Sequence, residues 1–155
     1  ASEKIHEAVL SPLDIHAAKA GDEDKRIVRL LIKRMKTYDR LVGYYSSRFD
    51  IPFIRTRAMG MGLEFPVYGE LHHTDLYFVL RHRFCLSSNR LENACRAMLG
   101  KTEKTRIESK FWRGGVRGDR KSLRYISTHN RFDVLDLEKL YRKVIMVSRP
   151  TRTSL

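Results

Sequence analysis

The sequence predicts an α/β protein that is rich in helices and has few, parallel strands. Leu41 to Tyr45 form an apolar run of branched and aromatic residues, which is typical of a buried strand. After Asp50 the apolar residues recur three or four positions apart, which is the periodicity of a helix. A second strand is predicted at Leu71 to Leu76. Since open α/β sheets bind ligands beyond the carboxyl ends of their strands, Asp50 lies where a functional site is expected.

The region before the first predicted strand should contain a short strand at residues 5–10, which Ser11-Pro12 ends, and then one helix. Gly21 to Asp24 place three acids at the start of that helix, where they complement its dipole. A basic row on the same helix is typical of a solvated face. The apolar stripe of the helix is predicted to consist of Ile27, Val28, Leu31, Met35 and Tyr38.

The second half of the chain is predicted to be mostly helical. Ser87 to Asn89 should cap one helix and Gly100 should stop it. Between that glycine and the last helical region lies a polar, basic excursion from Lys101 to Gly118. The predicted helices lie at residues 76–83, 90–100 and 119–146, the last with a break near His129-Asn130 and with Val134 and Leu140 buried. Residues 1–147 are expected to form one domain, and residues 148–155 a mobile tail.

The charge of the chain favours a polyanionic partner. Its 155 residues include 31 Lys and Arg against 18 acids, which gives a net charge of +13. Phosphate backbones are the commonest partners of so basic a domain. The sequence has no apolar run near the roughly 18 residues that a membrane span needs and no secretory signal pattern. Cys85 and Cys95 lack partners at metal-ligand spacing, so both are predicted to be buried free thiols in a reducing compartment, the cytoplasm.

A second motif lies near the end of the chain. Tyr125, His129 and Asp133 are each four residues apart and should share a helix face. This stretch, together with Phe49-Asp50-Ile-Pro-Phe, resembles the DnaQ-like DEDD 3′–5′ exonucleases of the ribonuclease H-like fold, including phage and archaeal members and DNA polymerase B exonuclease domains. The resemblance covers roughly residues 22–146, with the second and third motifs of the family in the correct order.

The resemblance implies a metal-dependent 3′–5′ exonuclease that hydrolyses the phosphodiester bonds of DNA or RNA with Mg²⁺ or Mn²⁺. Asp50 and Asp133 match two of the four carboxylates with which this family binds a pair of ions. His129 stands four residues before the last acid, where one subclass has Tyr, and would orient or deprotonate the attacking water. Tyr45 replaces an Asn that commonly lies near the nucleotide, and could stack on a base instead.

The Asp-x-Glu motif with which the family begins is absent from this chain. Asp14-Ile-His16 is a superficial match that is rejected, because His16 stands where the second carboxylate belongs. Two carboxylates offer too little charge to hold two divalent ions together. The N-terminal strand hairpin of the fold is therefore expected to lie on upstream chain or on a partner subunit, and the chain is interpreted as part of a larger domain.

Aromatic and basic residues supply candidate contacts to single-stranded DNA or RNA. Stacking rings among cations are what single-strand binding uses, and the basic excursion contains Phe111-Trp112. The alternative is that these two rings pin the excursion to the core. The predicted nucleic-acid-binding residues are Tyr45, Arg48, Lys110, Trp112, Arg113 and Arg131.

Three functions remain open at this stage: the exonuclease, a non-catalytic nucleic-acid-binding module with the same fold, and a fragment whose sheet a partner completes. Asp50 alone could be no more than a helix N-cap. Asp75 is predicted to be a structural acid that bonds to local backbone rather than a metal ligand. His72, His73 and His82 lack convincing metal spacing and are expected to face solvent or nucleic acid.

Overall fold

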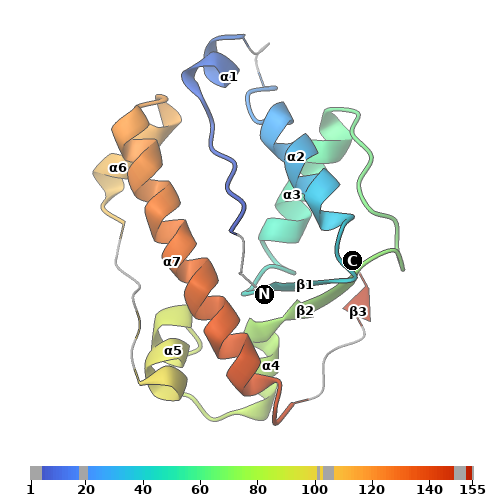
Figure 1. Cartoon of the computed structure of the whole chain (residues 1–155), viewed down its shortest axis with the longest axis vertical. Coiled ribbons are helices and arrows are strands. Elements are labelled where there is room, and N and C mark those ends of the chain that lie inside the picture. Colours follow the sequence, from blue (N-terminus) through green and yellow to red (C-terminus); the bar gives the residue numbers. More distant parts are fainter. Residues whose placement is uncertain (1–4, 18–20, 101, 103–106, 149–152, 155) are drawn as a thin grey trace.

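The computed structural model describes residues 5–17, 21–100, 102, 107–148 and 153–154. Within these ranges it is a helix-rich α/β structure with two parallel strands, which confirms the predicted fold class (Figure 1). The helices are α1 (Pro12–Ala17), α2 (Lys25–Met35), α3 (Asp50–Gly60), α4 (Leu76–Arg83), α5 (Leu91–Leu99), α6 (Ser109–Val116) and α7 (Arg120–Val144). The strands are β1 (Arg40–Gly43), β2 (His72–Asp75) and β3 (Thr153–Ser154).

The sheet has the order β1-β2-β3, with β1 and β2 parallel and β2 and β3 antiparallel. The register pairs Arg40 with His72 and Gly43 with Asp75, so the two parallel strands end side by side. Within the described part of the chain β1 is an edge strand, because it pairs with β2 alone. Of the tail that was predicted to be mobile, residues 153–154 form β3, while 149–152 and 155 lie outside the described residues.

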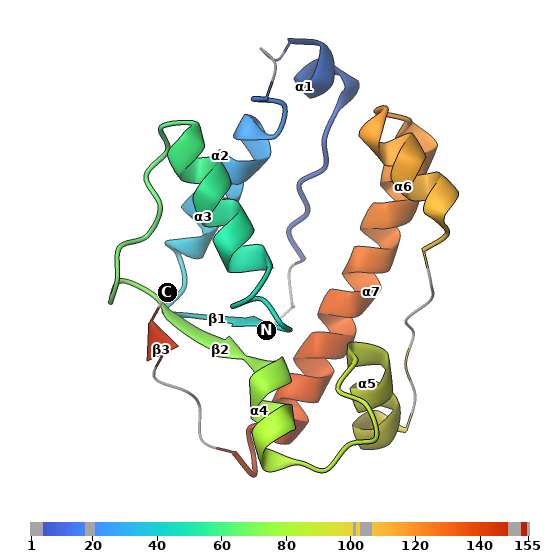
Figure 2. The same cartoon turned by 180° about the vertical axis from the view of Figure 1, so that it is seen from behind.

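The long helix α7 runs along one side of the molecule, and the pair α2 and α3 lies on the other (Figures 1 and 2). Three hydrophobic clusters hold these parts together. The first joins α4, α5 and α7 through Leu76, Val79, Leu80, Ala94, Cys95, Leu140 and Val144. The second joins α2 and α3 through Val28, Ile32, Ala58 and Met61. The third consists of Met35, Ile51 and Leu71 and connects those helices to the sheet.

Several predicted elements differ from the observed ones. Residues 5–10 are extended but pair with no described strand, and in both views they run between α2 and α7. α7 is continuous through His129-Asn130. Residues 109–116, predicted as part of an irregular excursion, form α6, because Phe111 and the glycines after it pack against α7. Lys101, Lys104 and Arg106 lie outside the described residues.

Burial also differs from the prediction at five positions. Val28 and Met35 of the predicted α2 stripe are buried, but Leu31 and Tyr38 are exposed, and Ile32 is buried instead. Val134 is exposed beside a pocket. Of the two thiols, Cys95 is buried in the first cluster and Cys85 is exposed. The Cys85 prediction was wrong because this residue follows the end of α4, outside the packed face.

Gly43 closes β1 at a point with no space for a side chain. A Cβ added there would lie 1.9 Å from Ser46 Oγ. We predict that Gly43→Ala lowers the free energy of unfolding by about 1–3 kcal/mol, because overpacking must displace Ser46. Urea denaturation measures this change. Gly60→Ala is the matched control, since a Cβ there meets nothing within 4 Å and should be neutral or stabilising. Equal stability of both variants and the unmodified chain would contradict the assignment.

Candidate functional site

The site begins where the two parallel strands end. Gly43 and Asp75 are partners in the sheet, and each is followed by a segment that turns away from it. Residues 44–49 lead from β1 into α3, and α4 starts directly after β2. Because both turns leave from the carboxyl edge of the same sheet, their side chains are brought together, which is where open α/β sheets form binding sites.

The carboxylate of Asp75 fixes this edge by accepting four hydrogen bonds. The backbone N–H groups of Tyr45 and Ser47 donate to it over 2.8 and 2.9 Å, and the Ser47 hydroxyl over 2.6 Å. The backbone N–H of Tyr77 donates over 3.1 Å, so Asp75 is also the N-cap of α4. The prediction that Asp75 bonds to local backbone is confirmed at Tyr77, whereas the donors of Tyr45 and Ser47 belong to the distant loop after β1.

The loop after β1 contains a left-handed residue. Tyr45 has a φ of 61°, a conformation that costs free energy for any residue with a Cβ. The hydrogen bond from its N–H to Asp75 stabilises this backbone, and its ring packs edge-on against Tyr77 with centroids 4.9 Å apart. Asn tolerates the left-handed region better than most residues, so this backbone would also accept an Asn.

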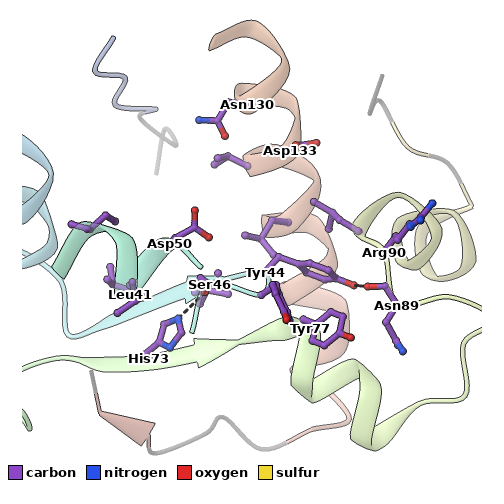
Figure 3. A pocket seen from close by; sticks show the side chains of 18 of the residues that line it. Leu41, Tyr44, Ser46, Asp50, His73, Tyr77, Asn89, Arg90, Asn130 and Asp133 are labelled. Atoms are coloured by element: carbon purple, nitrogen blue, oxygen red, sulfur yellow. Dashed lines mark hydrogen bonds between the residues drawn. The ribbon is translucent and has the colours of Figure 1, made fainter. Parts of the chain in front are cut away.

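Beneath the loop lies a buried polar pair. Ser46 Oγ and His73 Nε2 share a hydrogen bond of 2.9 Å, and both residues are buried (Figure 3). The prediction that His73 faces solvent or nucleic acid was wrong, because His73 is buried and bonds to Ser46, whereas His72, at the start of β2, is exposed. His82 is exposed, as predicted. Burial lowers the pKa of His73, so its imidazole favours the neutral form.

A pocket of about 1070 Å³ opens beside this pair. The Asp50 carboxylate points from the start of α3 toward α7, on which Asn130 and Asp133 lie (Figure 3). Asp50 and Asp133 therefore line one pocket although they come from elements far apart in the sequence. The remaining lining is mixed. Polar residues such as Ser46 and His73 occur there together with apolar residues, namely Leu31, Met35, Leu41, Ile51, Ile54, Leu91, Val134 and Leu137.

Asp50 is exposed at the rim of the pocket, and neighbouring protein atoms partly desolvate its carboxylate. This desolvation raises its pKa from the usual 3.8, and the charge of Asp75 adds to the effect. Asp50 is the first residue of α3, and Phe49 occupies the N-cap position with no side-chain hydrogen bond. The alternative that Asp50 is simply the N-cap is therefore not what the structure has. A carboxylate of raised pKa in a pocket is typical of a functional site.

His129 does not join the pocket. It is buried, its ring lies 4.3 Å from the ring of Tyr125, and it is not among the described residues that line the pocket. Four residues advance a helix by about 40° more than one turn, so Tyr125 and Asp133 differ by about 80° around α7. The predicted common face thus divides, with Tyr125 and His129 packed toward Phe111 and with Asn130 and Asp133 toward the pocket.

The described residues do not complete a metal site. Among them no group of three or more His, Cys, Asp or Glu side chains could hold a metal ion. The pocket lining contains the carboxylates of Asp50 and Asp133 and that of Glu92, which is paired with Arg96. These fit part of a magnesium or manganese site and no more. Asp14, from the superficial first-motif match, is held by Ser11 and by Arg26, whose guanidinium keeps the Asp14 pKa well below its usual range. This engagement agrees with rejecting Asp14 as a ligand.

The predicted nucleic-acid contacts are at the surface but form two separate groups. Tyr45 lines the pocket, and the Arg48 guanidinium lies 5.9 Å from the centre of the Phe78 ring. Arg131 is exposed on α7 beside Asn130. The other group is on α6, where Lys110 pairs with Glu108 over 2.7 Å. Trp112 and Arg113 are also exposed on that helix.

The sequence prediction missed Ser46, His73 and Asn130 as pocket residues. Two signals could have found them. A glycine at the end of a buried strand indicates close approach of another side chain, here Ser46. The alternation of His72 and His73 along a strand indicates that one of them is buried. Asn130 is three residues before Asp133, a spacing that also puts two side chains on neighbouring positions of one helix face.

The chain also matches a protein-family model. The model described as the RNase H superfamily matches residues 7–145. The chain therefore belongs to the ribonuclease H superfamily, whose members usually use divalent metals and act on nucleic acids. A search of the curated proteins found no match. No helix in the described ranges is long and apolar enough to cross a membrane.

The buried His73 predicts a pH dependence of stability. Its pKa is lower in the folded chain than the ordinary 6.5, so the unfolded chain binds a proton more tightly. Stability is therefore complete above about pH 6.5 and falls as the pH drops through that value. The charges that act on His73 are those of Asp75, Arg40 and Asp50, and the raised Asp50 pKa works in the opposite direction, adding stability as the pH falls.

We predict that His73→Gln loses less stability than the unmodified chain when the pH is lowered from about 7.5 to about 5.5. Urea denaturation at several pH values measures the difference. His82→Gln, at an exposed histidine of α4, is the matched control and should follow the unmodified chain. Parallel profiles for all three proteins would rule out His73 as the titrating group.

Proposed function

We propose that this chain is a metal-dependent 3′–5′ exonuclease of the DnaQ-like DEDD class, which hydrolyses phosphodiester bonds of DNA or RNA. One observation carries the proposal: Asp50 and Asp133, the residues that match the second and third motifs, line the same pocket. Membership of the ribonuclease H superfamily supports it, since nuclease activity is common there. The raised pKa of Asp50 agrees with a functional carboxylate.

The proposed substrate is a single strand. The net charge of +13 favours a phosphate backbone. Phe111 stacks on Tyr125 with ring centroids 3.8 Å apart, so this ring anchors α6 to α7. Its neighbour Trp112 is 54% exposed and remains available to a base. Of the two alternatives for this aromatic pair, packing therefore fits Phe111 and nucleic-acid contact fits Trp112, with Lys110 and Arg113 as phosphate contacts.

The proposed cofactor is Mg²⁺ or Mn²⁺, which would activate water and stabilise the leaving oxygen in this family's chemistry. Because the described carboxylates are too few, no reaction step is assigned to the ion. We propose that further carboxylates come from a strand on upstream chain or a partner subunit. The support is that β1, which borders the pocket, is an edge strand in the described sheet and so has a backbone edge to which a strand can add.

Asn130 is a better candidate than His129 for a residue that orients water or phosphate. Asn130 is exposed and lines the pocket with Asp133, whereas His129 is buried against Tyr125. A catalytic role for His129 would require its ring to leave that packing. We therefore propose Asp50 and Asp133 as the metal-binding residues and Asn130 as their polar neighbour on α7.

A second candidate is a nucleic-acid-binding module without catalysis. The observation that favours it is the lack of any three-ligand group among the described residues. Such a module would use the same basic and aromatic surface and would keep the fold. The two candidates predict the same binding but differ in whether a divalent ion leads to cleavage.

The test is hydrolysis of a 5′-labelled single-stranded oligonucleotide by the full-length product of the gene that encodes this chain. We predict stepwise shortening from the 3′ end that requires Mg²⁺ or Mn²⁺. Asp50→Asn and Asp133→Asn should each lower the rate by at least about 100-fold, since even outer-shell partners of a metal contribute up to that much. Glu64→Gln, at an exposed acid outside the pocket, is the control.

Binding that weakens steeply with salt, with no metal-dependent cleavage, would contradict the exonuclease and select the binding module. Cleavage that survives both Asp→Asn variants would contradict the assigned site. Gel electrophoresis of the labelled products separates these results, because shortening from the 3′ end leaves a ladder of labelled strands.

A further inference from the structure

Three rings form a nearly parallel series that starts at the pocket lining, with Tyr45, and continues away from it along α4. The rings of Tyr45 and Phe78 have centroids 6.1 Å apart and planes 26° apart. The rings of Phe78 and His82 follow with 6.3 Å and 18°. We call Tyr45, Phe78 and His82 the aromatic shelf. Tyr45 is 46% exposed and His82 is also exposed, so the two ends of the shelf are open to solvent.

The ring of Tyr77 and a backbone hydrogen bond hold the shelf rings in place. The Tyr77 ring meets Tyr45 at 74° and Phe78 at 85°, with centroids 4.9 and 5.0 Å away. The Tyr45 backbone is held by its hydrogen bond to Asp75. Rings held in this way lose little freedom when a planar ligand stacks on them, so less binding free energy is spent on ordering them.

Positive charge accompanies the shelf. The Arg48 guanidinium lies 5.9 Å from the centre of the Phe78 ring, and Arg81, in the last turn of α4, donates to the Tyr77 hydroxyl over 3.2 Å. Cations in the last turn of a helix are favourable for the helix itself. That effect does not explain why the rings of Tyr45 and His82 are exposed. Asp75, the carboxylate at the other end of α4, is directed at its four donors.

We propose that the aromatic shelf is a stacking site for an unpaired base of a nucleic acid whose backbone reaches the pocket. Rings that present a face and cations that meet phosphates are the combination that single-strand binding uses. Tyr45 and Tyr77 also line the pocket, so the shelf and the pocket are continuous. The inference rests on the proposed function for the presence of nucleic acid, but it concerns base recognition and requires no metal.

Binding of this chain to labelled oligothymidylate of about 12 nucleotides tests the shelf, measured by fluorescence anisotropy in EDTA. The matched probe is an abasic strand of the same length, which has the same phosphates and no bases. Phe78→Leu and His82→Ala should each weaken binding of oligothymidylate between about 5-fold and about 100-fold. Binding of the abasic strand should stay unchanged, because its phosphate contacts are intact.

Tyr68→Leu, at an aromatic residue that is 87% exposed and outside the shelf, is the control variant and should bind both strands as the unmodified chain does. Since His82 is exposed, His82→Ala should fold normally and tests the shelf even where Phe78→Leu has a folding defect. Equal loss on both strands, or no loss on oligothymidylate, would overturn the shelf. This experiment measures binding and not cleavage, so its outcome is independent of the exonuclease test. The shelf proposal can be wrong while the exonuclease proposal is right, and base-dependent binding can occur in a protein without nuclease activity.

Discussion

The Asp75 carboxylate is the interaction on which the site depends. It lies at the end of β2, caps α4 and holds the loop after β1 by hydrogen bonds to Tyr45 and Ser47. Three parts of the chain are thereby fixed relative to one another by a single side chain. A carboxylate accepts charge-assisted hydrogen bonds that are stronger than neutral ones, so it can hold the unfavourable backbone of Tyr45. Asp75 is therefore committed to structure, and the chemistry that we propose is assigned to other acids.

The loop that Asp75 holds determines where Asp50 lies. Gly43 lets Ser46 approach the strand closely, and the Ser46–His73 hydrogen bond fastens the middle of the loop to β2. The Ile51 N–H donates to the Ser46 carbonyl over 2.9 Å, which places the first turn of α3 on top of the pair. Asp50 then stands at the rim of the pocket, opposite the residues that α7 contributes.

The sequence was sufficient for the elements whose ends have a local chemical cause. α4 begins after the cap Asp75, and α5 ends at Gly100, which has a φ of 77°. Motif resemblance, which identifies residues without needing their distance, singled out Asp50 and Asp133, and both line one pocket. The sequence failed where the direction of a side chain on its helix or strand determines its surroundings. His129 packs against Tyr125 instead of lining the pocket, and His73 is buried while its neighbour His72 is exposed. It also failed for α6, whose packing on α7 is a tertiary effect.

We propose that Asp50 and Asp133 bind one cation between them. Titration of Mn²⁺ into the isotope-labelled chain, followed by NMR, tests it directly, because a paramagnetic ion broadens the signals of nearby nuclei. A shared ion should weaken the amide signals around Asp50 and Asp133 together, and Asp133→Asn should reduce the broadening at both places. Broadening around only one of the two residues, or at neither, would contradict it.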